Sequence, residues 1–172
     1  MDLNNYIRDI ADFPKKGIIF KDITPLLKNK NGFDYMLEMF KKRLIGKKID
    51  QVVGIESRGF ILGAPLANIL NCGFVPIRKK GKLPYSVISE TYDLEYGKAT
   101  LEIHDDALEK KNNVVLIDDV LATGGTVNAS LKLLESFKVN VVECQFLIEI
   151  KKLNGAKKIL SKNEKYYSIL KY

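Results

Sequence analysis

The stretch VVLIDDVLATGGT, residues Val114–Thr126, decides the fold of this 172-residue chain. Its first four residues form an apolar run, which is typical of a strand buried on both faces of a parallel sheet. Two adjacent carboxylates, Asp118 and Asp119, follow at the edge of an open α/β sheet where ligands bind. Thr123-Gly124-Gly125-Thr126 then opens a helix, so that unobstructed amides and the helix N-terminus can hold an anion. The stretch therefore predicts a phosphate site at the carboxyl end of a buried strand.

The adjacent carboxylates fit a ligand that carries hydroxyl groups as well as a phosphate. A ribose 5-phosphate meets this condition, because its phosphate fits the glycine loop while its 2′ and 3′ hydroxyls can donate to Asp118 and Asp119. The stretch has neither the GxxxxGK[ST] of P-loops nor the GxGxxG of dinucleotide-binding folds. The alternative is an acidic loop before a glycine-rich helix start that binds nothing.

Apolar runs and amphipathic segments alternate on both sides of this stretch. Short apolar runs predict strands at 51–55, at 74–77 and within 139–150, with a candidate edge strand at 166–170. Helical spacing predicts helices over about 3–10, 33–44, 62–70 and 126–137. This alternation predicts an α/β fold, with an open, mainly parallel central sheet flanked by helices.

The 35 residues between 78 and 114 interrupt this rhythm, because they show no helical pattern. Alternating residues in YSVISETY (85–92) and KATLEI (98–103) predict a two-stranded ribbon. Excursions of this length in compact domains are usually functional or disordered, and the aromatic and β-branched content argues against disorder. We therefore expect a mobile flap over a site.

Composition narrows the classes of function. With 46% hydrophobic and 28% charged residues, the chain reads as one soluble domain, and no apolar run is long enough to cross a bilayer. The N-terminal residues resemble no secretory signal, so a cytoplasmic location is expected. The net charge of +7 comes largely from lysine pairs scattered along the chain, whereas nucleic-acid binders usually concentrate their charge. Solvated surface lysines and a polyanionic small substrate both remain open as interpretations.

Cysteine and histidine carry no recognisable chemistry in this sequence. Cys72 and Cys144 lie in apolar surroundings without a zinc-ligand spacing, so we expect buried free thiols. His104 is the single histidine and has no nucleophile motif beside it, so a triad of the usual type is not indicated.

Four further segments carry a resemblance together with Val114–Thr126. In chain order they are FPKKGIIFKDITPLL (Phe13–Leu27), GIESRGFILGAPLA (Gly54–Ala67), RKKGKLP (Arg78–Pro84) and LEYGKATLEI (Leu94–Ile103). Val114–Thr126 resembles the phosphoribosyl-diphosphate (PRPP) motif of type I phosphoribosyltransferases, and the ordered segments resemble the adenine-specific family among them. The resemblance covers most of the chain. It implies one phosphoribosyltransferase domain over residues 1–172, with a hood at about 1–32 and a flap at about 79–103.

The resemblance also implies a reaction. Such an enzyme of purine salvage transfers the phosphoribosyl group of PRPP to adenine, giving AMP and diphosphate. Mg²⁺ is the implied cofactor, held mainly by PRPP and not directly by the protein, and a homodimer is the implied assembly. The implied residues for the 5′-phosphate are Ala122, Thr123, Gly124, Gly125 and Thr126, and those for the ribose are Asp118 and Asp119.

Diphosphate binding is implied for the loop after the strand at 51–55 and for a basic cluster at the start of the flap. The implied residues are Glu56, Ser57, Arg58, Arg78, Lys79 and Lys82, with Arg58 also a catalytic residue. The resemblance implies a cis peptide between Glu56 and Ser57. From the residues alone, a surface arginine at a helix start and an ordinary lysine-rich turn remain the alternatives.

Adenine recognition is implied for Ile19, Phe20 and Lys21 in the hood, and for Val120, where the family more often has leucine. Phe20 would stack on the ring while the Ile19 carbonyl and the Lys21 amide read its edge; plain core packing is the alternative for Phe20. Glu95 matches the family's catalytic acid candidate in the flap, although on spacing alone a solvated flap glutamate is the better interpretation.

Two rival functions remain. A phosphoribosyltransferase for hypoxanthine, guanine or xanthine would share the PRPP motif, so that residues 17–22 decide the base. A regulatory domain that senses PRPP without turnover would also share the motif, but the length leaves no room for an added DNA-binding segment.

Overall fold

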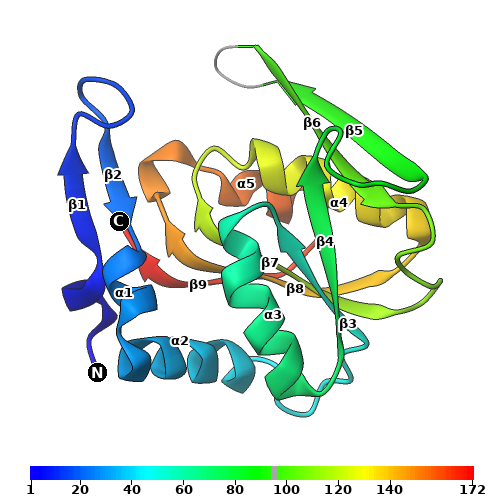
Figure 1. Cartoon of the computed structure of the whole chain (residues 1–172), viewed down its shortest axis with the longest axis horizontal. Coiled ribbons are helices and arrows are strands. Elements are labelled where there is room, and N and C mark those ends of the chain that lie inside the picture. Colours follow the sequence, from blue (N-terminus) through cyan, green and yellow to red (C-terminus); the bar gives the residue numbers. More distant parts are fainter. Residues whose placement is uncertain (94–96) are drawn as a thin grey trace. The chain divides into compact units, whose positions relative to one another are not determined.

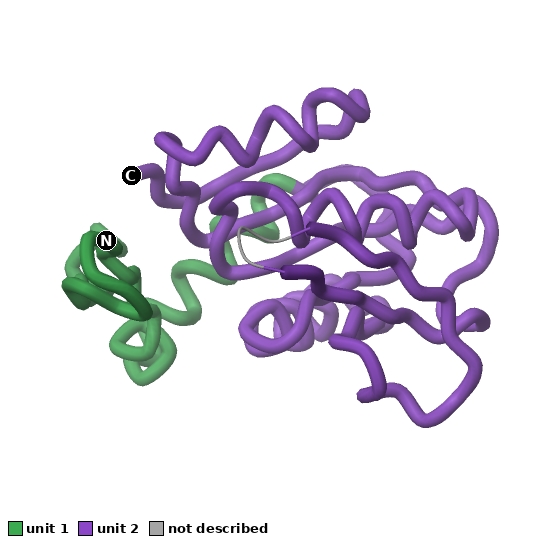
Figure 2. Tube along the Cα trace, turned by 90° about the horizontal axis from the view of Figure 1, so that it is seen from above, with its two compact units in different colours: residues 1–43 green, residues 44–172 purple. Residues whose placement is uncertain are grey.

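A computed structural model describes residues 1–93 and 97–172 of the chain. The contacts among these residues divide the chain into two units, residues 1–43 and residues 44–172 (Figure 2). Each unit is described below by itself.

In the described residues of the second unit, seven strands form one sheet (Figure 1). Their order across the sheet is β5 (Val87–Asp93), β6 (Lys98–His104), β4 (Gly73–Lys79), β3 (Gln51–Ile55), β7 (Asn113–Leu121), β8 (Asn140–Glu149) and β9 (Tyr166–Lys171). The five strands from β4 to β9 run parallel, while β6 is antiparallel to β4 and to β5. The predicted mainly parallel sheet is confirmed, and the predicted ribbon is β5 with β6, which extends the sheet through β4.

Helices cover both faces of this sheet. Successive side chains of a strand point to opposite faces, so the apolar strands make both faces apolar and both must be covered. Helix α3 (Arg58–Leu70) packs on β3 and β7, where Gly63 lies against Phe74 and Ile117. The other face packs against α4 (Gly125–Phe137) and α5 (Ala156–Leu160). The short 3₁₀ helix η2 (Lys151–Leu153) precedes α5. Buried residues of the core on that face include Val53, Ile55, Ile77, Ile103, Leu116, Leu131, Leu134 and Phe146.

The ends of β3 and β7 lie side by side in the sheet. From β3 the chain passes through α3 to β4 on one side, and from β7 it passes through α4 to β8 on the other. Such a reversal of strand order opens a crevice at the carboxyl ends of the strands. The loops after β3 and β7 therefore meet at the place where an open α/β sheet binds ligands.

The first unit contains a two-stranded hairpin and helices. Its elements are the 3₁₀ helix η1 (Leu3–Tyr6), β1 (Arg8–Ala11), β2 (Ile19–Asp22), α1 (Thr24–Lys28) and α2 (Lys30–Lys42). Helix α2 begins three residues before the predicted Phe33, because the Asn29 side chain caps it by accepting from the Gly32 amide. Met36, Leu37 and Phe40 form its buried stripe, as the spacing predicts.

The predicted helix over residues 3–10 is wrong beyond Tyr6. Residues Arg8–Ala11 are extended and pair antiparallel with β2, with Arg8 opposite Asp22 and their side chains in an ion pair of 3.2 Å. Pairing with a partner strand farther along the chain outweighs the weak local helical pattern.

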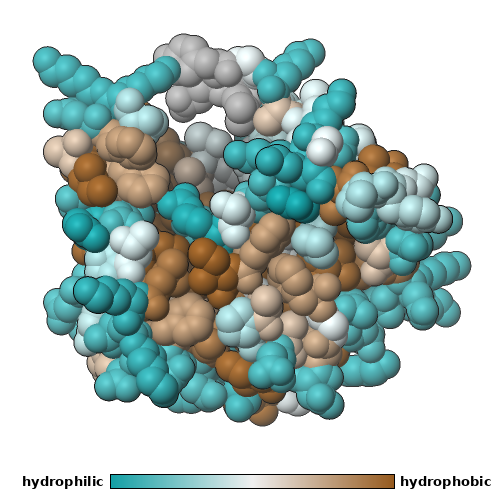
Figure 3. Space-filling model, viewed as in Figure 1, coloured by the Kyte–Doolittle hydropathy of each residue, from teal (hydrophilic) through white to brown (hydrophobic). Residues whose placement is uncertain are grey.

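Surface and thiol predictions are largely borne out. All lysines of the consecutive pairs are exposed except Lys41; these pairs stand at 15–16, 41–42, 47–48, 79–80, 110–111, 151–152 and 157–158. Hydrophilic side chains dominate the rim of the face in Figure 3. Both cysteines are free, Cys144 buried and Cys72 half-buried, and burial raises the pKa of each thiol. None of the helices in the described part of the chain combines the length and hydropathy that a bilayer crossing requires.

Candidate functional site

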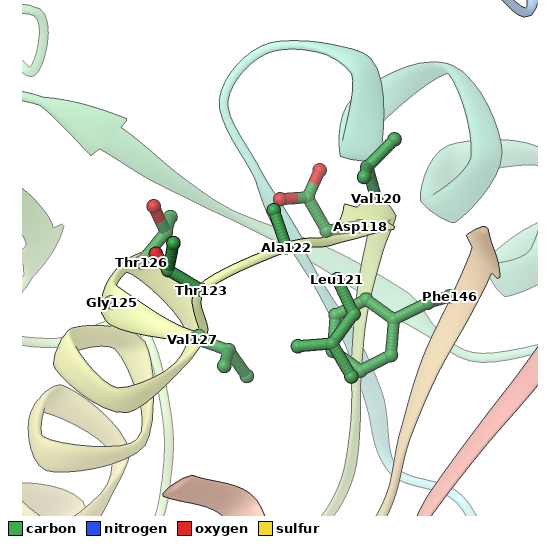
Figure 4. A pocket seen from close by; sticks show the side chains of 10 residues that line it. Asp118, Val120, Leu121, Ala122, Thr123, Gly125, Thr126, Val127 and Phe146 are labelled. Atoms are coloured by element: carbon green, nitrogen blue, oxygen red, sulfur yellow. The ribbon is translucent and has the colours of Figure 1, made fainter. Parts of the chain in front are cut away.

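The end of β7 and the start of α4 enclose a pocket of about 70 Å³. Figure 4 shows Asp118 and Val120 projecting from the end of β7 on one side, with Thr123 in the loop before α4 and Thr126 in its first turn on the other. The lining also includes Leu121, Ala122, Gly124, Gly125, Val127 and Phe146. Every residue that the sequence predicts for a 5′-phosphate therefore lines this pocket. Helix α4 has 13 residues, so its N-terminus carries the partial positive charge that favours an anion.

Two glycines shape the backbone of this pocket. Gly124 has φ +75°, in the left-handed region that favours glycine, and a Cβ there would lie 2.6 Å from the Gly155 carbonyl oxygen. Gly155 is buried at the start of α5, and a Cβ on it would collide with the Ala122 carbonyl oxygen and lie 2.9 Å from the Gly124 nitrogen. Backbone therefore contacts backbone here. The sequence offers only an Asn-Gly turn signal at 154–155, so Gly155 was not among the predicted site residues.

The carboxylates of Asp118 and Asp119, near the end of β7, have different surroundings. Asp118 lines the pocket, while Asp119 is 3% exposed and its carboxylate forms an ion pair of 2.8 Å with the Arg58 Nε. The Asp119 amide donates to Asp118 Oδ1 at 2.9 Å. Burial raises the pKa of Asp118 well above its usual value, and the neighbouring Asp119 charge adds to the rise. Burial also raises the pKa of Asp119, although the Arg58 guanidinium opposes this.

Arg58 reaches Asp119 because α3 begins close to the end of β7. Gly59 makes this approach possible, since a Cβ there would lie 2.7 Å from the Ile117 carbonyl oxygen and 3.2 Å from Asp118 Oδ1. The loop after β3 and the loop after β7 are thus in direct contact at the crevice.

The loop between β3 and α3 contains the expected cis peptide between Glu56 and Ser57. The Glu56 carboxylate accepts from the Lys79 amide at 2.9 Å and from Arg78 Nε at 3.2 Å. Burial alone would raise the pKa of Glu56, but the Lys79 amide and the Arg78 charge outweigh it and lower the pKa. Arg78 also donates to the Lys82 carbonyl oxygen at 3.2 Å, while Lys79 and Lys82 are exposed. These hydrogen bonds join four of the six residues predicted for diphosphate and connect the loop after β3 to β4 through Glu56. Ser57 and Arg58 follow Glu56 in the chain, and Arg58 pairs with Asp119.

The residues predicted for adenine lie in different units. Ile19, Phe20 and Lys21 follow one another on β2 in the first unit, where the Phe20 ring meets Phe13 edge-on at 5.2 Å. Val120 lies on β7 in the second unit and lines the pocket.

Strand β5 lies close to the pocket at the start of α4. Tyr92 on β5 places its hydroxyl 3.1 Å from Thr126 Oγ1, and sequence patterns gave no sign of this contact. The predicted acid Glu95 lies outside the described residues.

Among the described residues that line the pocket, Asp118 is the one carboxylate. Within residues 1–93 and 97–172, no cluster of three histidine, cysteine, aspartate or glutamate side chains could hold a metal ion. Of the two aspartates after the β7 core, only Asp118 faces the pocket, as Asp119 pairs with Arg58. Asp118 could therefore contact a metal ion that arrives with a substrate.

Comparisons with known proteins agree with this geometry. Residues 24–171 match the model of a family described as the phosphoribosyl transferase domain. An adenine phosphoribosyltransferase of Brachyspira hyodysenteriae is 54% identical over 166 residues, which cover 96% of this chain and 95% of that protein.

Solved structures agree as well. The crystal structure of adenine phosphoribosyltransferase from Thermoanaerobacter pseudethanolicus is 50% identical, with a TM-score of 0.94, over 99% of this chain and 98% of that one. The enzyme from Saccharomyces cerevisiae, crystallised with an imino-altritol bisphosphate and adenine, is 38% identical, with a TM-score of 0.93, over 98% and 96%. The chain therefore belongs to the phosphoribosyltransferase family, among the adenine phosphoribosyltransferases.

Proposed function

We propose that this protein transfers the phosphoribosyl group of PRPP to adenine, releasing AMP and diphosphate as a step of purine salvage. The observation that carries the proposal is the pocket between β7 and α4, in a chain whose relatives over nearly its full length are adenine phosphoribosyltransferases. The pocket offers a helix N-terminus and two threonine hydroxyls for the 5′-phosphate, with Asp118 beside them for the ribose.

In this proposal the enzyme works mainly by positioning and by electrostatic stabilisation. The transition state of such a transfer resembles an oxocarbenium ion, so the protein must hold the sugar while negative charge gathers on the departing diphosphate. Ala122–Thr126 fix the phosphate end. Asp118 accepts a hydrogen bond from a ribose hydroxyl, and Asp119, the next residue at the same end of β7, is assigned to the ribose as well.

The diphosphate end is assigned to residues Glu56–Arg58 and to the basic residues Arg78, Lys79 and Lys82. Arg58 offers a guanidinium at the crevice, and on substrate binding it would exchange part of its pairing with Asp119 for diphosphate oxygens. Glu56 holds Arg78 and the Lys79 amide, so its part is to fix the loop and not to face a polyanion.

Mg²⁺ is proposed to enter with PRPP, and when bound it neutralises diphosphate charge. Among this chain's own residues, Asp118 is the carboxylate that the pocket offers to such a complex.

Base recognition is assigned to a hood of about residues 1–32 with Val120, and proton donation to Glu95 in a flap of about residues 79–103. Phe20 would stack on the purine while the Ile19 carbonyl and the Lys21 amide pair with its edge. An oxo-purine reverses that donor pattern and leaves buried groups unpaired, at about 1–3 kcal/mol for each group. We further propose a homodimer in the cytoplasm, as the family resemblance and the sequence suggest.

The test is a panel of adenine, hypoxanthine, guanine and xanthine, each incubated with the protein, PRPP and MgCl₂. Chromatography of the products should show AMP as the dominant nucleotide. Preferred turnover of an oxo-purine would refute the choice of base. Tight PRPP binding without turnover of any base would favour the regulatory function, and light scattering in the same buffer tests the dimer.

A further inference from the structure

One face of strand β5 contacts helix α4. Ile88, Glu90 and Tyr92 share this face, because side chains alternate along a strand. Ile88 packs against the core, and the Glu90 carboxylate forms an ion pair of 2.7 Å with Lys132 on α4. The contact at the end of the strand is the one between Tyr92 and Thr126. Strand β5 therefore bears directly on the first turn of α4.

The Tyr92 side chain is fitted to that first turn by its ring as well as by its hydroxyl. A Cβ on Gly125 would lie 3.4 Å from Tyr92 Cδ2, so the ring packs on the glycine that begins α4. The hydroxyl lies 3.1 Å from Thr126 Oγ1, in a half-buried contact where either oxygen could be the donor. A phenylalanine would keep the ring contact and lose the hydrogen bond alone.

We propose that Tyr92 is a positioning residue of the phosphate site, which donates its hydroxyl proton to Thr126 Oγ1 and thereby directs the Thr126 proton to the bound phosphate. This inference rests on the proposed function. A phosphate ester dianion only accepts hydrogen bonds, so Thr126 must donate its single proton to it. The Thr126 oxygen can then only accept from Tyr92. The two hydroxyls form a chain in which each hydrogen bond strengthens the next.

The effect of Tyr92 is therefore on binding of the phosphate end and not on the chemical step. Loss of one ordinary hydrogen bond corresponds to about a 3- to 10-fold loss of affinity. Since substrate and transition state share the same 5′-phosphate, the loss raises the KM for PRPP and leaves kcat within about twofold.

The experiment compares Tyr92→Phe with the wild type by calorimetric titration with ribose 5-phosphate and by steady-state kinetics. The matched control is Tyr166→Phe on strand β9. This change removes a half-buried tyrosine hydroxyl that donates to the Glu149 carboxylate on β8 at 3.3 Å. We expect Tyr92→Phe to weaken ribose 5-phosphate and raise the PRPP KM by about 3- to 10-fold, and Tyr166→Phe to change neither.

A double-mutant cycle with Thr126→Val separates this role from a general effect on packing. In the Thr126→Val background, Tyr92→Phe should have no further effect on the affinity for ribose 5-phosphate. An equal loss in both backgrounds, or wild-type affinity of the single Tyr92→Phe variant, would overturn the inference. A wild-type protein that fails to bind ribose 5-phosphate would instead refute the proposed function.

Discussion

Replacing Gly155 by alanine tests the contact between α5 and the phosphate loop. Gly155 has φ −58° and ψ −31°, so alanine suits its backbone, and at an ordinary helix position the change would stabilise by up to about 1 kcal/mol. Here the added Cβ would collide with the Ala122 carbonyl oxygen and lie 2.9 Å from the Gly124 nitrogen. Both neighbours are backbone atoms, so no change of rotamer relieves the clash.

The magnitude follows from the distance that must open. Real Cβ contacts lie beyond 3.0 Å, so the loop and the start of α5 must separate by about 1 Å. Overpacking of this kind costs about 1–3 kcal/mol of the free energy of unfolding. A catalytic geometry misplaced by about 1 Å can lose 100-fold, so if the two segments share the displacement we expect kcat/KM for PRPP to fall about 10- to 100-fold.

The assays are urea unfolding and kinetics with PRPP varied at saturating adenine. The control is Gly73→Ala at the start of β4, where the added Cβ would also collide, but with the Gln51 side-chain amide, which can rotate away. We expect this control to lose less than about 1 kcal/mol and no affinity. If Gly155→Ala matches the wild type in both assays, the loop does not depend on this backbone contact.

Three further predictions concern titrating and catalytic groups. A raised pKa of Asp118 means that the folded state holds its proton to higher pH than the unfolded state, so folding stability falls as pH rises from 3.8 to the raised pKa. Asp118→Asn should remove this fall, so that at neutral pH the variant unfolds at a higher urea concentration than the wild type while it binds PRPP more weakly. The lowered pKa of Glu56 means that its ionised carboxylate stabilises the folded state at neutral pH, and that this stability is lost as pH falls through the pKa of the folded state. Glu56→Gln should therefore lower the free energy of unfolding by about 1–3 kcal/mol at pH 7 in urea unfolding, with no difference from the wild type in acid. Glu95→Ala should lower kcat by about 10²–10⁴-fold with little change in the dissociation constant for PRPP, and an equal loss of PRPP affinity would contradict its role as an acid.

The fold was predictable because its signals are local. The apolar run Val114–Ile117 is buried in β7, and the segments of alternating residues at 85–92 and 98–103 correspond to β5 and β6. The stretch Val114–Thr126 and the four further segments were sufficient for the family, which the comparisons confirm.

Other parts of the site depend on contacts between distant residues, which sequence spacing does not carry. Gly155 meets Ala122 only because α5 returns to the end of β7, and Tyr92 meets Thr126 across 34 positions. The ion pair of Arg58 with Asp119 likewise depends on how closely α3 approaches β7 at Gly59. The error at residues 8–10 has the same origin, because β1 is defined by its partner strand.

The departure of α3 and α4 to opposite faces of the sheet has an evolutionary consequence. Each of the two loops at the crevice leads into a helix on its own face of the sheet, so that substitutions at residues 56 and 57 need not alter residues 122–126. The constraints that the two loops share are the glycine at position 59 and the ion pair of Arg58 with Asp119. A scaffold of this kind can keep binding one activated sugar while substitutions in the other loop change the acceptor or the way in which the leaving group is released.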